Sequence, residues 1–268
     1  ARDGMGKIFM AAPLNPKDLA PLVQEKEVIT WDTRKGGLIA TKDLRIGSIV
    51  LQSKPLPSPD PGHLAKAISD AIKQDGERLL SFDENVMQWQ HRVLSLRKWN
   101  PEEGWPDVGT HTLLTTNEEW LTPYLNNIKK PEDLKKLDIT SILQNSLDWE
   151  KQKALQALAP TFIKVPSGSE IKLNYVSPGE PPVLAVRLQE VFGMADTPKI
   201  NNGKNSVVLH LLSPGYKPVQ VTSDLKSFWG NAYFEVRKDL KRRYPKHSWP
   251  DDPWTAEAVR GVKRKNPS

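Results

Sequence analysis

Hydrophobic positions along this chain change their spacing twice, near residues 55 and 160. In residues 6–53, short apolar runs alternate with polar positions, and this period of two is typical of strands. One such run, residues 26–32, leads into a hairpin turn over Asp32–Gly37. Three or four strands of this length predict an incomplete small barrel or sheet, whose open edge needs a partner.

Residues 54–62 contain four prolines and predict a linker. After it the period becomes helical. Asp60 is placed to cap a helix that Pro61 opens and that ends near Gly76, with apolar residues at Leu64, Ala67, Ile68, Ala71 and Ile72 on one face. Apolar positions three and four apart predict further helices over residues 83–99, 111–127, 131–147 and 148–160, the second of them interrupted at Pro123.

Strand patterns return at Thr161. Residues 161–176 predict a hairpin with its turn at Pro166–Ser169, and residues 181–193 predict a compact helix that Gly193 ends. Two strands and a last helix follow, and this ββαββα order predicts a small α+β domain. The chain thus has four expected parts, which are a β-rich segment at 1–55, a helical segment at 56–160, an α+β domain at 161–253 and a mobile basic tail at 254–268.

The last predicted helix is amphipathic. Its apolar side carries Leu225, Phe228, Trp229, Ala232, Val236 and Leu240, and its basic side carries Arg237, Lys238, Lys241 and Arg242. Gly230-Asn231 is a candidate kink between its two halves. Such a helix is expected to pack its apolar side on the domain and to present its cations to solvent.

Charge changes the picture of this helix. The net charge is +6, and from Glu235 to the end ten Lys and Arg stand against five Asp and Glu. Cations suit phosphates and flat rings suit bases, so this region is a candidate nucleic-acid interface. The candidate residues are Arg237, Lys238, Lys241, Arg242 and Lys246, with Tyr244 and Trp249 for stacking, and Arg34 and Lys35 in the β-rich segment.

Each candidate has a plainer alternative. A charge run is often a solvated helix face, and the proline-flanked rings of Tyr244 and Trp249 can be buried as a structural terminator. Arg34 and Lys35 can simply keep a hairpin turn soluble. Between these alternatives and RNA contact the sequence leaves the choice open.

Other chemistry has little support. The chain has no cysteine, which excludes disulfides and thiolate sites. Its five histidines are dispersed without metal-ligand spacing, and Ser167 and Ser169 lie in a hairpin turn rather than a nucleophile elbow. No apolar run has the length of a membrane helix and no signal layout opens the chain, so a cytoplasmic protein without membrane partners is expected.

Four blocks carry a family resemblance, namely residues 158–175, 181–200, 207–229 and 233–253. In order and spacing they resemble the C-terminal domain of HrpB-type helicases, which are bacterial DEAH-box proteins. Weaker similarity runs upstream. Residues 28–57 resemble the segment where related helicases carry an OB-like barrel, and residues 117–125 and 138–160 resemble the connecting helices.

The resemblance implies the C-terminal third of an ATP-dependent RNA helicase, cut inside its OB-like region. ATP and Mg²⁺ then belong to the parent's motor lobes, and no cofactor is expected in this part. Phosphate-loop and Asp-Glu-x-His motifs are absent: Gly6-Lys7 precedes Ile8, and Gly203-Lys204 precedes Asn205. We therefore expect no ATP hydrolysis by this chain alone; robust RNA-stimulated hydrolysis by the purified chain would refute this.

Two functions remain from the sequence. The first is an accessory, non-motor role: binding or orienting single-stranded RNA and supporting the motor domains, which would be its partners. The second is a protein–protein interaction module of the same helicase without direct nucleic-acid contact.

Overall fold

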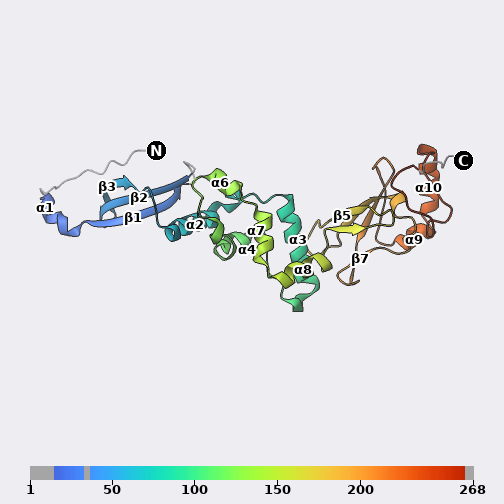
Figure 1. The fold of residues 1–268 in the computed structure, drawn as a ribbon, viewed down its shortest axis with the longest axis horizontal. Coiled ribbons are helices and arrows are strands. Elements are labelled where there is room, and N and C mark those ends of the chain that lie inside the picture. Colours follow the sequence, from blue (N-terminus) through green and yellow to red (C-terminus); the bar gives the residue numbers. More distant parts are fainter. Residues whose placement is uncertain (1–14, 33–36, 263–268) are drawn as a thin grey trace, which may run out of the picture. The chain divides into compact units, whose positions relative to one another are not determined.

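A computed structural model describes residues 15–32 and 37–262 of the chain, which form two compact units (Figure 1). Unit 1 comprises the described residues within 1–81 and 116–137, and unit 2 comprises those within 82–115 and 138–268. Both units therefore take helices from the segment at 56–160. The molecule is a mixed α and β protein, as the α+β prediction requires at this level.

Unit 1 contains a three-stranded antiparallel sheet in the order β1-β2-β3. Its strands are β1 (Gln24–Asp32), β2 (Gly37–Ile46) and β3 (Ile49–Pro55). Gly47 makes the tight turn between β2 and β3 with a φ of 58°. The alternating pattern of this region is confirmed as strands, whereas residues 6–14 and the centre of the predicted turn at 33–36 lie outside the described residues.

The first long helix of unit 1 starts where the sequence predicts. α2 (Pro61–Leu79) begins after Asp60, whose Oδ2 accepts a hydrogen bond of 3.0 Å from the His63 backbone N–H. Leu64, Ile68 and Ala71 on its apolar face are buried. The helix passes Gly76 with a kink at Asp75. The remaining helices are α1 (Pro16–Leu19), η1 (Ala20–Leu22), α5 (Asn117–Trp120), η3 (Thr122–Tyr124) and α6 (Pro131–Lys135).

In unit 2, α3 (Glu84–Trp99) is capped by Asp83 and packs against two later helices, α7 (Ile139–Ser146) and α8 (Trp149–Leu158). Val86, Trp89, Val93 and Leu96 are buried as its period predicts. The other helices that unit 2 takes from the segment at 56–160 are η2 (Pro101–Glu103) and α4 (Thr110–Thr115). The expected helix at 131–147 is wrong in its continuity, because α6 and α7 replace it and the chain passes from unit 1 to unit 2 at Asp138. The expected helix at 111–127 is wrong in its continuity, because α4, α5 and η3 replace it and the chain passes from unit 2 to unit 1 at Thr116.

Unit 2 also contains a five-stranded sheet in the order β10-β9-β6-β5-β4. The predicted hairpin at 161–176 is confirmed as β4 (Phe162–Lys164) and β5 (Glu170–Asn174). β6 (Val183–Arg187) runs parallel to β9 (Val208–Leu212), which pairs antiparallel with β10 (Pro218–Thr222). A separate pair is β7 (Lys199–Ile200) and β8 (Asn205–Ser206).

The expected helix at 181–193 is wrong. The chain forms β6 there, followed by η4 (Leu188–Glu190), so the order is not ββαββα. Leu184 and Val186 are buried while Ala185 between them is exposed, which is the period of two of a strand. β6 has a neighbour on each edge, and backbone pairing on both sides outweighs the helix-start signal of the preceding prolines.

The chain end does not leave the domain at Trp254. The Val259 backbone N–H donates to the Gln189 carbonyl at 3.0 Å, and Arg260 Nε donates to the Ser167 carbonyl at 3.2 Å. The prediction of a mobile tail is therefore wrong for residues 254–262, and residues 263–268 lie outside the described part. Within that described part, no helix has the length and apolar character to cross a membrane.

Candidate nucleic-acid interface

The candidate interface is built on α9 (Leu225–Gly230) and α10 (Tyr233–Arg243), at the end of unit 2 (Figure 1). Asp224 caps α9 by accepting a hydrogen bond of 2.9 Å from the Ser227 backbone N–H. Asn231 then breaks the helix with a φ of −126° and a ψ of −82°. The break falls at the Gly230-Asn231 pair that the sequence singles out as a kink.

An aromatic cluster anchors these helices. Trp229 and Tyr233 are fully buried and lie edge-to-face, with ring centroids 5.3 Å apart, and Phe192 lies within 6.1 Å of both rings. Trp229 Nε1 donates to the Met194 carbonyl at 2.8 Å, and the Tyr233 hydroxyl donates to the Pro250 carbonyl at 2.7 Å. The apolar side of the predicted amphipathic helix is thus its buried side, with Tyr233 as an additional member.

Two of the four predicted RNA-binding cations on α10 have acidic partners on the same helix. Lys238 pairs with Glu235 at 2.8 Å, and Arg242 pairs with Asp239 at 2.9 Å. Arg243 also reaches Asp239, at 3.3 Å, and these two guanidinium groups hold the pKa of the Asp239 carboxyl below its usual value. All three cations are on the solvent side of the helix, where such pairs are weak and open to exchange.

Arg237 has a different role. Its side chain is only 20% exposed, and its Nε donates to the Trp249 carbonyl at 2.9 Å while the guanidinium pairs with Asp251. These contacts tie α10 to the segment that follows it. Arg237 is therefore a structural tether, and its positive charge is already matched by a carboxylate.

Among the cations predicted in this tract, Lys241 and Lys246 are the two with no ion-pair partner in the described part of the chain. Both side chains are exposed. Lys241 lies in the last turn of α10, and Lys246 follows the helix by three residues. They are the residues of this tract best placed to meet an incoming phosphate.

The aromatic residues after α10 are part of the architecture. Trp249 is 7% exposed, and its Nε1 donates to the Tyr244 carbonyl at 2.9 Å. The Tyr244 ring is half-buried, with its hydroxyl 3.3 Å from Ser213 Oγ. Stacking of a base on Trp249 would require this segment to open. Trp249 therefore fits the alternative of a buried structural terminator better than the role of an RNA ligand.

His247 lies between these two rings, 6.0 Å from Tyr244 and 6.5 Å from Trp249 between ring centroids. Burial, and secondly the positive charge of Arg187, lower the pKa of its imidazole. Its Nδ1 is buried and has no hydrogen-bond partner among the described residues. Protonated His247 is therefore disfavoured, and the ring acts as a neutral packing element.

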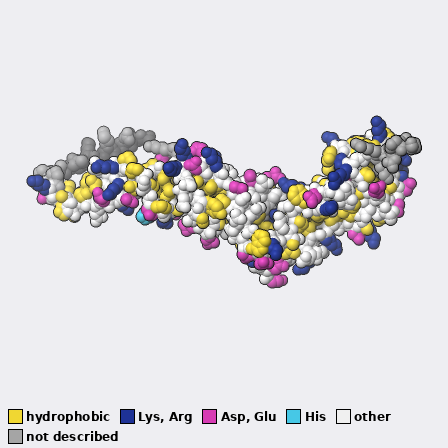
Figure 2. All heavy atoms as spheres, viewed as in Figure 1, with side chains coloured by type: hydrophobic (Ala, Val, Ile, Leu, Met, Phe, Trp, Pro, Cys, Tyr) yellow, Lys and Arg dark blue, Asp and Glu magenta, His cyan; other side chains and the backbone are white. Residues whose placement is uncertain are grey.

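In unit 1 the predicted site residues Arg34 and Lys35 lie outside the described residues. Two neighbouring cations of the sheet are paired: Lys42 with Glu25 at 2.7 Å, and Arg45 with Asp43 at 2.8 Å. On the face shown in Figure 2, blue Lys and Arg side chains are interspersed with magenta Asp and Glu side chains.

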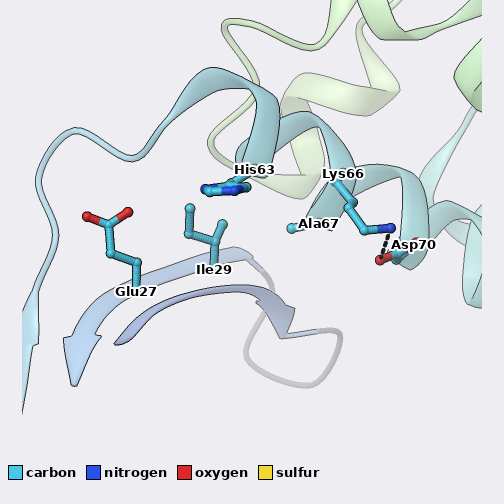
Figure 3. Close-up of a pocket in the computed structure, with 6 residues that line it drawn as sticks. All are labelled: Glu27, Ile29, His63, Lys66, Ala67 and Asp70. Carbon is cyan, nitrogen blue, oxygen red and sulfur yellow. Dashed lines mark ion pairs between the residues drawn. The ribbon is translucent and has the colours of Figure 1, made fainter. Parts of the chain in front are cut away.

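A shallow cavity of about 210 Å³ lies between α2 and β1 in unit 1 (Figure 3). It is lined by Glu27, Ile29, His63, Lys66, Ala67 and Asp70, with Lys66 paired to Asp70 at 3.6 Å. Across the described residues, no group of three acidic or histidine side chains could hold a metal ion. The cavity does not include any of the residues predicted to bind nucleic acid.

The turn that resembles a nucleophile loop is a hydrogen-bonded support. The hydroxyls of Ser167 and Ser169 donate to Glu190 Oε1 at 3.0 and 2.6 Å, and Arg187 donates to its Oε2 at 3.0 Å. Burial opposes ionisation of Glu190, but these hydrogen bonds outweigh it and lower the pKa of the carboxyl. Both serine hydroxyls therefore donate to the Glu190 carboxylate and support the turn.

Sequence reasoning missed Tyr216 in the loop between β9 and β10. This side chain is 65% exposed, and Arg187 lies over its ring with Cζ 4.9 Å from the centroid. A tyrosine inside the turn Pro214–Pro218, next to Lys217, is a signal that could have drawn attention to it. Arg187 was hidden because its segment was predicted to be a helix.

Two family models match the chain. The model described as "ATP-dependent helicase C-terminal" (HrpB_C) matches residues 120–253, and the model described as "ATP-dependent RNA helicase HrpB, connector region" matches residues 22–56. A curated relative, the ATP-dependent RNA helicase HrpB of Escherichia coli (strain K12), is 40% identical over 243 residues. Those residues are 91% of this chain and 30% of the relative.

Solved structures agree. A crystal structure of the E. coli DExH-box NTPase HrpB matches with a TM-score of 0.76 at 38% identity, over 92% of this chain and 31% of that one. A second, of the Escherichia coli DEAH/RHA helicase HrpB, matches with a TM-score of 0.66 at 37% identity, over 91% and 30%. The chain therefore spans less than a third of the length of each relative.

Proposed function

Because this chain belongs to the HrpB family of ATP-dependent helicases, we propose that it is a non-motor, C-terminal part of an ATP-dependent RNA helicase that binds single-stranded RNA. RNA contact is made by the solvent side of α10 and the segment after it. ATP and Mg²⁺ are bound by motor domains in the longer protein. The RNA-binding surface lies on the C-terminal α+β part at 161–253, which is a portion of unit 2.

The observation that carries this proposal is the pair of unmatched cations at the end of α10. Lys241 and Lys246 are exposed without an ion-pair partner among the described residues, and Lys238 and Arg242 have only exposed partners. RNA phosphates compete well for exposed cations, because binding releases counterions. The buried aromatic cluster under α10 holds these cations on a fixed surface, so little order has to be gained on binding.

A second part of the proposal concerns the motor. β3 in unit 1 exposes three consecutive apolar residues, Ile49 at 64%, Val50 at 45% and Leu51 at 53%. Leu51 lies at an irregularity in the pairing with β2, but Ile49 and Val50 are consecutive paired residues that point to opposite faces, so both faces of this edge strand are apolar and open. We propose that the sheet β1–β3 belongs to an OB-like barrel completed in the longer protein, where it supports the motor domains.

The same apolar strand favours the alternative function, a protein-interaction module without nucleic-acid contact. The two functions separate in one experiment: fluorescence anisotropy of labelled oligouridine with the purified chain over a salt series. Tight binding that weakens steeply with salt is the expected result. Absence of binding at low salt, together with a partner recovered on this chain, would establish the alternative instead.

A further inference from the structure

The loop between β9 and β10 presents an aromatic ring to solvent from a strained backbone. Tyr216 is 65% exposed and has a φ of 62°, a left-handed conformation that is unfavourable for a residue with a large side chain. Such strain persists only where the surrounding structure imposes it, and it is concentrated at ligand-binding sites. An exposed ring held this way requires an explanation other than core packing.

Hydrogen bonds fix this loop. The Tyr216 backbone N–H donates to the Ser213 carbonyl at 2.9 Å, and the Lys217 backbone N–H donates to Ser213 Oγ at 3.1 Å. Ser213 itself is fully buried. The position of Tyr216 is therefore set by the sheet and is not that of a free loop.

The loop is also attached to the basic end of α10. The Tyr244 hydroxyl lies 3.3 Å from Ser213 Oγ, and a Cβ added at Gly215 would lie 2.8 Å from that hydroxyl, so the two segments are in close contact. Arg243 lies over the Tyr244 ring at 5.9 Å. The exposed ring of Tyr216 thus lies beside the segment that carries Lys241, Arg243 and Lys246.

One side of the Tyr216 ring is supported by a fixed cation. Arg187 Cζ lies 4.9 Å from the ring centroid, and the Arg187 side chain is only 16% exposed. Its Nε donates to Glu190 Oε2 at 3.0 Å, and the other oxygen of Glu190 accepts from Ser167 and Ser169. This chain of contacts holds the guanidinium against the ring and leaves the rest of the ring for a ligand.

We infer that Tyr216 is a base-stacking residue for single-stranded RNA, with Arg187 as the positioning residue beneath its ring. The inference rests on the RNA-binding role proposed above and extends the surface from α10 to the β9–β10 loop. An exposed ring next to cations is the combination that binds single strands, because every base has a flat face and every nucleotide has a phosphate. The cations of the α10 end, together with Lys217, meet the phosphates on either side of the stacked base.

The test replaces Tyr216 in the full chain and measures affinity for oligouridine. Tyr216→Ala is expected to weaken binding by about 5- to 150-fold, the range for loss of one stacked base. The salt dependence keeps its slope, since no phosphate contact is lost, and Tyr216→Trp retains the affinity. Phe162→Ala is the matched control, because Phe162 is an aromatic residue of the same unit that is 51% exposed.

A glycine variant separates stacking from folding. Tyr216→Gly removes the ring but relieves the left-handed strain, so its Tm should not fall although its RNA affinity falls as for alanine. If the wild-type chain binds RNA and both variants bind equally well, the inference about Tyr216 is wrong and the proposed function stands. If the wild-type chain binds no RNA at low salt, the proposed function itself is wrong and Tyr216 has no base to stack on.

Discussion

The cations near the C-terminus, which look alike in the sequence, fall into three groups by their contacts. Arg237 is a tether to Trp249 and Asp251, Lys238 and Arg242 are paired on the helix surface, and Lys241 and Lys246 are unmatched. The pairing of Lys238 and Arg242 is predictable from the sequence, because Glu235 and Asp239 precede them by three residues and therefore lie on the same side of a helix. The partner of Arg237 is not predictable in this way, because Asp251 is fourteen positions away and is brought near by the turn after α10.

His247 gives a prediction for pH. Burial lowers the pKa of its imidazole below the usual 6.5, so the unfolded chain binds this proton more strongly than the folded chain does. The stability contributed by the neutral ring is present above about 6.5 and is lost as pH falls toward the folded pKa, by at most about 1.4 kcal/mol per pH unit. Denaturant unfolding of the chain at several pH values measures this loss.

The matched variant is His247→Gln, which keeps a polar side chain and removes the titration. It should flatten the stability profile in the pH range just below about 6.5, which lies above the range in which carboxylates titrate. Profiles of the same steepness in wild type and variant would show that His247 is not the group responsible.

At the level of elements, α2 and α3 were predictable because local signals agree with burial. An aspartate at each N-cap and apolar residues at helical spacing fix where each helix starts and which side it buries. β6 was not predictable from its own residues. Val183–Arg187 has a helix-like start in Pro181-Pro182, and only its position between β5 and β9, a long-range fact, makes it a strand.

A buried guanidinium joins two helices of unit 2. Arg92 on α3 is 4% exposed, and it donates from Nε to the Ala159 carbonyl at 2.6 Å and from Nη2 to Gln156 Oε1 at 2.8 Å. It thereby satisfies carbonyl groups at the C-terminal end of α8, where a cation is favoured. Burial lowers the pKa of Arg92 to about 10, so it stays charged at neutral pH.

Arg92→Ala should therefore destabilise unit 2 by about 1–3 kcal/mol for each buried acceptor left without a donor. Arg92→Lys should recover only part of this, because an ammonium group lacks the planar fork that reaches two acceptors. Thermal unfolding of the full chain measures both. Arg242→Ala is the control, since the Arg242 side chain is 82% exposed; an equal Tm in all variants would contradict this role of Arg92.

At the scale of the whole molecule, the sequence was enough to predict the family. It predicted the candidate RNA-binding surface only in part. The blocks from Leu158 to Pro253 indicated the HrpB family, and the comparisons confirm it. The charge excess located the candidate interface near α10, but composition does not show which cations are paired. Trp249 and Tyr216 illustrate the difference: the ring that the sequence offered as a candidate is buried, as its structural alternative predicts, and a ring that was not a candidate is exposed.

The longer relatives set the frame for function. The chain covers 30% of the E. coli helicase, so ATP hydrolysis and strand separation are proposed for the complete protein and RNA contact for this part. We propose that this surface holds the strand that the motor has released. On this account the C-terminal part contributes affinity and orientation and no chemistry.

The most direct test of this account is the salt dependence of RNA binding in two matched double variants. Lys241→Gln with Lys246→Gln removes the unmatched cations, and Lys238→Gln with Arg242→Gln removes two cations that already have carboxylate partners. With about 0.7 of slope per phosphate contact on a single strand, the first variant should lose about 1.4 from the slope of log affinity against log salt. The second should lose less. An unchanged slope in the first variant would contradict RNA contact at the end of α10.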